Sequence, residues 1–352
     1  MKIGDCTLLV GDCRDMLRTM PDQSVNCCVT SPPYFGLRDY GVDGQMGLEE
    51  TPDEYVAGMA EVFREVRRVL RDDGTLWVNL GDSYASAWAC NRQNVIAAGS
   101  LKKGKRKDRP NRLVNGLKEK DLIGIPWRVA FALQADGWYL RQDIIWSKPN
   151  PMPESVTDRC TKAHEYIFMM SKSPRYHFDQ EAILEPSSPN THARLSQNVQ
   201  DQIGSGRVPG KTNGTMKAVG RKFDPGKGNK NNPSFDAAMA IMPPHRNKRS
   251  VWTVTTKPFK EAHFATYPVK LIEPCILAGC PVGGMVLDPF GGAGTTAVVA
   301  AKHGRQSMLI ELNSDYAEIA TKRIREAYAQ PDMFIEAEKD DPATQTTMDL
   351  AV

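Results

Sequence analysis

Apolar positions along residues 51–150 follow a helical period in some stretches and a strand-like pattern in others. In "TPDEYVAGMAEVFREVRRVLRDDG", apolar residues recur mostly three or four positions apart, at Tyr55, Met59, Val62, Phe63, Val66 and Leu70. That spacing places them on one face of a helix. Thr51 fits the N-cap, Pro52 fits the first turn and Glu54 completes a capping box. The pattern therefore predicts a helix that starts at Pro52 and is stopped by Gly74.

The same alternation of helix and strand continues further along the chain. "TLWVNL" has the apolar and β-branched content of a strand that stops at Gly81, and residues 125–150 show the pattern of helix, glycine turn and strand. Residues 259–328 repeat it in "YPVKLIEPCILAGC", "GMVLDPF", "TTAVVAAKHG", "QSMLIEL" and "DYAEIATKRIREAY". Strands alternating with helices of this length predict an α/β fold, with a doubly wound, mostly parallel sheet covered on both faces.

Residues 186–250 interrupt this pattern. The segment is rich in Gly, Pro, Ser, Asn and Lys and has almost no apolar periodicity. It is too long for a plain connection within a compact domain, so it is either disordered or an inserted module that orders on a partner. We therefore divide the chain into a first α/β part, a basic insert, a second α/β part and a loosely ordered tail, at residues 1–185, 186–250, 251–330 and 331–352.

Positive charge is concentrated in two segments of the 352-residue chain, although its net charge is only +3. Residues 101–112, "LKKGKRKDRPNR", hold seven Lys or Arg against one Asp, which is +6. Residues 186–250 hold eleven against three Asp, which is +8, so the remainder carries about −11. Two basic segments on an acidic body favour a polyanion as partner.

Composition also excludes several classes of protein. No run approaches the roughly 20 apolar residues of a membrane span, so we expect no membrane association. The eight cysteines include no C-x-x-C pair, which indicates reduced thiols in a cytoplasm rather than a disulfide framework or zinc ribbon. His245 and His263 are isolated, so we expect no metal site.

The stretch "VLDPFGGAGTTAVVAAKHGRQSMLIELN" indicates a nucleoside-binding turn. A strand ends at Asp288, a glycine turn follows, and the next strand ends at Glu311, where an acid can accept hydrogen bonds from ribose hydroxyls. Asp288 and Phe290 at the turn suit a cationic ligand better than a pyrophosphate. S-adenosylmethionine (SAM), with its ammonium and sulfonium groups, fits these residues, whereas NAD does not.

A second unusual turn follows an apolar strand in "VNCCVTSPPYFG". Pro32 and Pro33 lack an N–H and have a fixed φ, so the chain cannot extend a strand or start a helix smoothly here. Such a rigid turn presents carbonyl oxygens and the ring of Tyr34 to a ligand. Together, "TSPPY" and "DPFGGAGTT" resemble the amino-group DNA methyltransferases, which modify N4 of cytosine or N6 of adenine, in the motif order called β.

The resemblance covers residues 1–180 and 259–328, and "IIWSKPN" (144–150) also matches the usual ending of the family's catalytic half. It implies a circularly permuted, Rossmann-like methyltransferase fold, SAM as cofactor and duplex DNA as substrate. The family places its target-recognition region where residues 186–250 lie. The implied location is the cytoplasm of a bacterial cell, or of the host for a phage-encoded enzyme. A cognate restriction endonuclease and a homodimer are left open.

The resemblance also implies roles for individual residues. Asp12 would lie near the SAM adenine, Glu311 would hold the ribose and Asp288 the amino-acid end. The segment "HFATYPVKL" would contact the methionine portion through His263, Phe264, Thr266 and Pro268. The glycine turn would supply Pro289, Phe290, Gly291, Gly292, Gly294 and Thr295. The catalytic turn would be Ser31, Pro32, Pro33 and Tyr34.

The chemistry of amine methylation suits the catalytic turn. An exocyclic amine is a poor nucleophile because its lone pair is conjugated into the base. If Ser31 and the Pro32 carbonyl accept its two N–H bonds, they stabilise the positive charge that develops during attack. Tyr34 can stack on a base that has left the helix. Ser31 favours cytosine N4, since family members with Asp at this position typically modify adenine N6.

Other functions remain as alternatives. They are an N6-adenine DNA methyltransferase, an RNA or protein amide methyltransferase, and a catalytically inactive protein that binds DNA or senses SAM. A C5-cytosine enzyme would need a nucleophilic cysteine after a proline, and Cys275 after Pro274 lies within an apolar helical pattern typical of a core thiol.

Overall fold

The computed structural model describes residues 1–37, 39, 41–85, 116–187, 245–256 and 266–329. The basic run 101–112, most of the insert 186–250, the tail 331–352 and the expected cofactor residues His263 and Phe264 lie outside the described residues. The chain divides into two compact units, one made of residues 1–182 and 249–352 and the other of residues 183–248.

The first unit is built on one sheet. Within the described residues this sheet has nine strands in the order β1-β2-β11-β10-β3-β4-β6-β5-β9. The strands are β1 (Lys2–Ile3), β2 (Cys6–Val10), β3 (Val25–Thr30), β4 (Leu70–Leu80), β5 (Tyr139–Ser147), β6 (His164–Ser171), β9 (Val251–Thr253), β10 (Met285–Asp288) and β11 (Gln306–Glu311). Strands β2, β11, β10, β3 and β4 run parallel, while β6 runs antiparallel to both β4 and β5. The expected mostly parallel sheet is confirmed.

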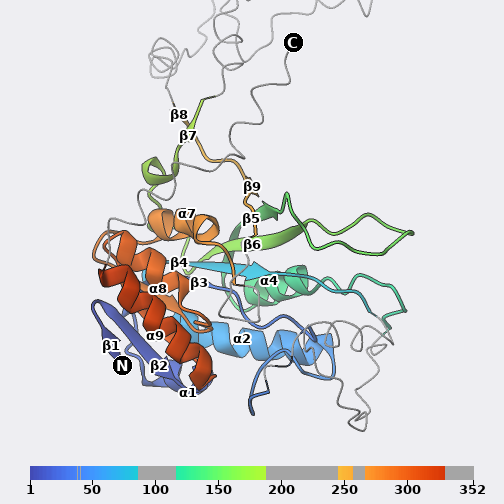
Figure 1. The fold of residues 1–352 in the computed structure, drawn as a ribbon, viewed down its shortest axis with the longest axis horizontal. Helices are drawn as coiled ribbons and strands as arrows, with labels where there is room; N and C mark the ends of the chain where they lie inside the picture. Colours follow the sequence, from blue (N-terminus) through green and yellow to red (C-terminus); the bar gives the residue numbers. More distant parts are fainter. Residues whose placement is uncertain (38, 40, 86–115, 188–244, 257–265, 330–352) are drawn as a thin grey trace, which may run out of the picture. The chain divides into compact units, whose positions relative to one another are not determined.

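Helices cover both faces of this sheet. They are α1 (Cys13–Thr19), α2 (Pro52–Val69), α4 (Ile125–Ala135), α7 (Val269–Gly279), α8 (Thr295–Lys302) and α9 (Ser314–Ala329). Helices α1, α2 and α4 pack in one core cluster, where Tyr55, Phe63 and Phe168 are fully buried. Helices α8 and α9 pack on the other face against Leu309, and α7 lies beside them (Figure 1). The fold is therefore doubly wound, as the alternation of patterns predicts.

Helix α2 begins as expected but ends earlier. Thr51 Oγ1 accepts from the Glu54 amide, and the Glu54 carboxylate accepts from the Thr51 amide, both at 3.1 Å. The helix ends at Val69, whereas the sequence predicted a stop at Gly74. Leu70 adopts an extended conformation, because β4 begins there and pairs Leu70 with Val25. Gly74 lies within β4, where a Cβ would come within 3.1 Å of the Asn26 carbonyl oxygen, so it permits a close strand approach.

The second unit is described only at its ends. Strand β7 (Glu185–Pro186) pairs antiparallel with β8 (His245–Arg246). The Glu185 carboxylate lies 3.6 Å from Arg246 Nε and 3.5 Å from Lys248 Nζ. Across both units, no helix within the described residues is long and apolar enough to cross a membrane.

The direction of the strands brings distant segments to one edge of the sheet. The carboxyl ends of the five parallel strands lie together, as the pairings of Val10 with Glu311 and of Thr30 with Val78 show. Because β6 is antiparallel to β4, its first residues lie at the same edge, where Tyr166 pairs with Leu80. Ligands of open α/β sheets bind at this edge.

Candidate active site

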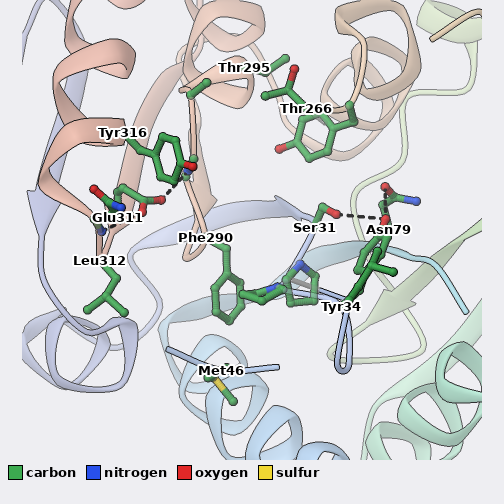
Figure 2. A pocket seen from close by; sticks show the side chains of 18 of the residues that line it. Ser31, Tyr34, Met46, Asn79, Thr266, Phe290, Thr295, Glu311, Leu312 and Tyr316 are labelled. Carbon is green, nitrogen blue, oxygen red and sulfur yellow. Dashed lines mark hydrogen bonds between the residues drawn. The ribbon is translucent and has the colours of Figure 1, made fainter. Parts of the chain in front are cut away.

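A cavity of about 700 Å³ lies at the carboxyl edge of the sheet, within the range usual for ligand sites. Figure 2 shows Glu311, Leu312 and Tyr316 on one side, Ser31, Tyr34 and Asn79 on the other, and Phe290 between them. The cavity is lined by these residues expected from the sequence: Asp12, Ser31, Pro32, Pro33, Tyr34, Thr266, Pro289, Phe290, Gly291, Gly292, Thr295 and Glu311. Pro268, Asp288 and Gly294 do not line it.

The Ser31–Tyr34 turn is held by the elements beneath it. Tyr55 of α2 donates to the Pro33 carbonyl oxygen at 2.8 Å. A Cβ on Gly47 would come within 3.0 Å of the Tyr34 carbonyl oxygen, so the following loop packs tightly against the turn. Among the described residues, no group donates to the Pro32 carbonyl oxygen. This carbonyl is therefore available to a ligand.

The hydroxyl of Tyr34 belongs to a buried polar cluster. Its oxygen lies 2.7 Å from Glu165 Oε2, 3.1 Å from Asn79 Oδ1 and 3.3 Å from Ser31 Oγ. Lys148 Nζ forms an ion pair with the other oxygen of Glu165. Burial, together with the negative charge of Glu165, raises the pKa of Tyr34 well above its usual value. The neutral phenol is therefore the donor to Glu165.

Gly81 leaves the space that the Tyr34 ring occupies. A Cβ at this position would lie 2.5 Å from Tyr34 Cε2 and 2.9 Å from Cδ2. We expect Gly81→Ala to displace the ring and to lower the rate of catalysis at least about 10-fold, as misplacement of a positioning group does. Combining Gly81→Ala with Tyr34→Ala should add nothing to the loss from Tyr34→Ala alone, which a comparison of single-turnover rates measures. An additive loss would show that Gly81 acts elsewhere.

The glycine turn is fixed by the acid that ends β11. Glu311 Oε2 accepts from the Gly292 amide at 2.7 Å, and Oε1 accepts from the Asn313 amide at 2.8 Å. These bonds leave lone pairs on both oxygens toward the cavity. Burial raises the pKa of Glu311, although the two amide donors oppose the shift. Gly294 allows the turn to pack closely on α9, since its φ is +77° and a Cβ there would lie 3.0 Å from Ala320 Cβ.

Asp288, which the resemblance expects to hold the amino-acid end of SAM, does not line the cavity. Its carboxylate is fully buried beneath the glycine turn. Oδ1 accepts from Thr30 Oγ1 at 2.7 Å and from the Phe290 amide at 3.1 Å, while Oδ2 accepts from Tyr267 Oη at 2.8 Å and from Thr296 Oγ1 at 2.6 Å. Four bonds use the four acceptor positions of a carboxylate. Burial raises the pKa of Asp288, against the lowering by these bonds. Its position therefore suits support of the turn rather than direct contact with a ligand.

The charges around the cavity suit a cationic ligand. Asp12, Glu165 and Glu311 line it, and Lys148 is the one cation among the described lining residues. Lys148 is already paired with Glu165. Asp12 accepts from the Arg14 amide at 2.8 Å, and hydrogen bonding from Arg14 lowers the pKa of its carboxyl. The lining residues that the structure describes thus fit the ammonium and sulfonium of SAM and offer no free cation to a phosphate.

Several lining residues were not expected from the sequence: Asn79, Trp146, Lys148, Asn150, Met152, Glu165, Tyr267 and Tyr316. Trp146, Lys148 and Asn150 belong to "IIWSKPN", whose match to the family could have indicated them. Asn79 is the second-to-last residue of β4, at the edge where the other site residues were placed. Glu165 had the weakest signal, because only the antiparallel direction of β6 brings it to this edge.

Comparisons with known proteins agree with this site. The family model of the N6/N4 DNA methylases matches residues 25–322. The chain is 44% identical to the type II methyltransferase M.Cfr9I of Citrobacter freundii over 329 residues, which covers 92% of this chain and 89% of the relative. It is 42% identical to the type II methyltransferase M.SmaI of Serratia marcescens over 319 residues, covering 91% and 90%.

Solved structures show the same fold. PvuII DNA methyltransferase, described as cytosine-N4-specific, matches with a TM-score of 0.55 at 16% identity, covering 93% of this chain and 92% of that one. TTHA0409 of Thermus thermophilus, in complex with S-adenosyl-L-methionine, matches with a TM-score of 0.53 at 22% identity, covering 91% and 93%. With a family model over most of its length and relatives above 40% identity, this chain belongs to the N6/N4 amino-group family of DNA methyltransferases.

Proposed function

We propose that this DNA methyltransferase transfers a methyl group from SAM to N4 of a cytosine that has been flipped out of duplex DNA. The observation that carries the proposal is one cavity with two unlike ends. At one end lie Glu311 and the glycine turn, and at the other the Ser31–Tyr34 turn, with Phe290 between them (Figure 2). Such a cavity can hold a nucleoside cofactor and a nucleobase side by side.

The glycine-turn end would hold the cofactor. The free lone pairs of Glu311 suit the ribose hydroxyls, and the ring of Phe290 suits the positive sulfonium. Thr266 and Thr295 offer hydroxyls on the same wall for the amino-acid end. SAM bound there supplies an electrophilic methyl group. The complex of TTHA0409 with SAM supports this assignment through the shared fold.

The Ser31–Tyr34 end would hold the base. The Pro32 carbonyl has no donor among the described residues, and Ser31 Oγ gives its own proton to Tyr34, so both oxygens can accept N–H bonds from an exocyclic amine. These bonds favour a pyramidal nitrogen and stabilise its developing positive charge. The Tyr34 ring, fixed by its hydroxyl, offers a face on which the flipped base can stack.

Two features support cytosine N4 over adenine N6. Ser31 stands where adenine-modifying family members typically carry Asp. PvuII DNA methyltransferase, which shares the fold, is described as cytosine-N4-specific. We further propose that the basic insert 186–250 supplies target recognition, since its net charge of +8 suits a phosphate backbone. A type II methyltransferase acts beside a cognate restriction endonuclease in the cytoplasm, which we propose for this protein also.

The test is methyl transfer from labelled SAM to duplex DNA, single-stranded DNA and RNA. We expect label in duplex DNA and, after digestion to nucleosides, recovery as N4-methylcytosine by mass spectrometry. Recovery as N6-methyladenine would overturn the choice of base. Label in RNA alone would overturn the substrate, and no label in any polymer would overturn the enzymatic function. Sequencing the methylated positions identifies the recognition site in the same experiment.

A further inference from the structure

We propose that Glu165 is the terminal acceptor of the proton that the target amine loses, reached through the hydroxyls of Ser31 and Tyr34. The proposal rests on the proposed function, because it concerns the same transfer step. It assigns a role to Glu165, which no motif in the sequence indicated. Ser31 and Tyr34 lie in the turn that follows β3, and Glu165 lies near the start of β6.

The topology places the Glu165 carboxylate behind the catalytic turn. Strand β6 runs antiparallel to β4 and β5, so Glu165, its second residue, pairs with Trp146 and lies at the edge where β3 ends. Its side chain is 15% exposed and lines the cavity. The carboxylate therefore lies next to the turn, and the hydroxyls of Tyr34 and Ser31 separate it from the place where the amine would bind.

The hydrogen bonds form a directed chain. Ser31 Oγ donates to Tyr34 Oη at 3.3 Å, and Tyr34 Oη lies 2.7 Å from Glu165 Oε2, which can only accept. Asn79 Nδ2 donates to Glu165 Oε2 at 3.2 Å and to the Tyr166 carbonyl at 3.1 Å, which fixes the amide and the carboxylate. Both hydroxyl protons thus point toward Glu165, and the lone pairs of Ser31 remain for the amine.

The proton transfer balances along this chain. The nitrogen–methyl bond forms as the sulfur–methyl bond breaks, which leaves a positive charge on the methylated amine and a neutral thioether. The amine then passes one N–H proton to Ser31 Oγ, the Ser31 proton moves to Tyr34 Oη, and the Tyr34 proton moves to Glu165 Oε2. The products are the neutral methylamine and a protonated Glu165, with both hydroxyls restored.

Basic side chains neighbour the Glu165 carboxylate. Lys148 at the end of β5 pairs with its other oxygen, and its ammonium also lies 4.2 Å from the centroid of the Trp146 ring. Lys162 in the loop before β6 and His164 at the start of β6 also feel the charge of Glu165, and burial lowers the pKa of both. The raised pKa of Tyr34 means that the phenol relays a proton without resting as a phenolate. The ion pair with Lys148 compensates for the burial of the Glu165 carboxylate.

A purely structural role would also explain the contact, since the hydroxyl of Tyr34 fixes its ring. Two variants separate the roles. Tyr34→Phe keeps the ring and removes the relay, and Glu165→Gln keeps the volume and removes the acceptor. Matched controls outside the cavity are Tyr176→Phe, which loses only a contact to Arg141, and Glu154→Gln, which loses only contacts of its own loop.

The experiment measures single-turnover methyl transfer to duplex DNA at saturating SAM, together with equilibrium binding of SAM and DNA by calorimetry. We expect Glu165→Gln and Tyr34→Phe each to lower the rate about 100-fold, the usual contribution of acid–base catalysis. Both binding constants should stay within about 3-fold of wild type, and the double variant should be no slower than either single one. The acid limb of the pH–rate profile should disappear in Glu165→Gln, and the controls should match wild type.

Any other result would contradict the transfer of the proton to Glu165. Rates of both variants within about 5-fold of wild type would show that no proton transfer passes through Glu165. A slow rate with an unchanged acid limb, or with weakened DNA binding, would leave Glu165 as a purely structural support of Tyr34. An absence of transfer in the wild-type protein itself would instead defeat the proposed function, which keeps the two failures apart.

Discussion

Replacing Ser31 with alanine is expected to reduce the single-turnover rate of methyl transfer about 100- to 1000-fold, the range for removing one group that stabilises transition-state charge. The Ser31 hydroxyl lies at the start of the catalytic turn, and its lone pairs face the cavity while its proton goes to Tyr34. Alanine removes one acceptor for the target amine and the first member of the proton chain. SAM affinity should be unchanged, because Glu311 and the glycine turn lie at the other end of the cavity.

The control is Ser24→Ala, which removes an exposed hydroxyl that donates only to the Pro21 carbonyl oxygen at 2.7 Å. This variant should match wild type in rate and in affinity for SAM. Ser31→Thr keeps a hydroxyl at the turn and should recover a measurable part of the activity lost in Ser31→Ala. If Ser31→Ala transferred methyl groups at the wild-type rate, the assignment of the catalytic turn would fail, whether the target is cytosine or adenine.

The elements of the fold follow from local patterns in the sequence. The start of α2 was predictable because its capping box and its apolar face agree on one helix. Its end was not, because Leu70 enters the core through pairing with Val25, which lies 45 positions earlier in the chain. Gly74, four residues later, resembled the end of a helix. Its glycine is instead explained by the close approach of the neighbouring strand.

The site shows the same division. Residues at the carboxyl ends of parallel strands were predictable, because parallel strands end at a common edge. Glu311 is the last residue of β11, and Ser31 directly follows β3. Glu165 was not, because the sequence does not show that β6 runs antiparallel and so begins at that edge. Neither were the partners of Asp288, since Thr30 and Tyr267 meet it only in the folded chain. A motif therefore identified a conspicuous acid without showing whether it faces the ligand or the interior.

Asp288→Ala is expected to destabilise the protein and to weaken SAM binding together. The carboxylate accepts four hydrogen bonds in a fully buried position, so its removal leaves the Thr30, Tyr267 and Thr296 hydroxyls and the Phe290 amide without their acceptor. We expect the free energy of unfolding to fall by about 3 kcal/mol, measured by urea denaturation. SAM affinity, measured by calorimetry, should fall because the Phe290–Gly292 turn loses its support.

Asp288→Asn separates this structural role from direct contact with the cofactor. Asparagine keeps the volume of the side chain and one carbonyl oxygen for Thr30 and the Phe290 amide, and the hydroxyls of Tyr267 and Thr296 can rotate to accept from its amide. If Asp288 supports the turn, this variant should regain most of the stability and most of the SAM affinity lost in Asp288→Ala. If its charge instead holds the cofactor ammonium, Asp288→Asn would fold with nearly wild-type stability and still bind SAM as poorly as Asp288→Ala. That outcome would return Asp288 to the cofactor-binding role expected from the sequence, and the four hydrogen bonds would then have to rearrange when the cofactor binds.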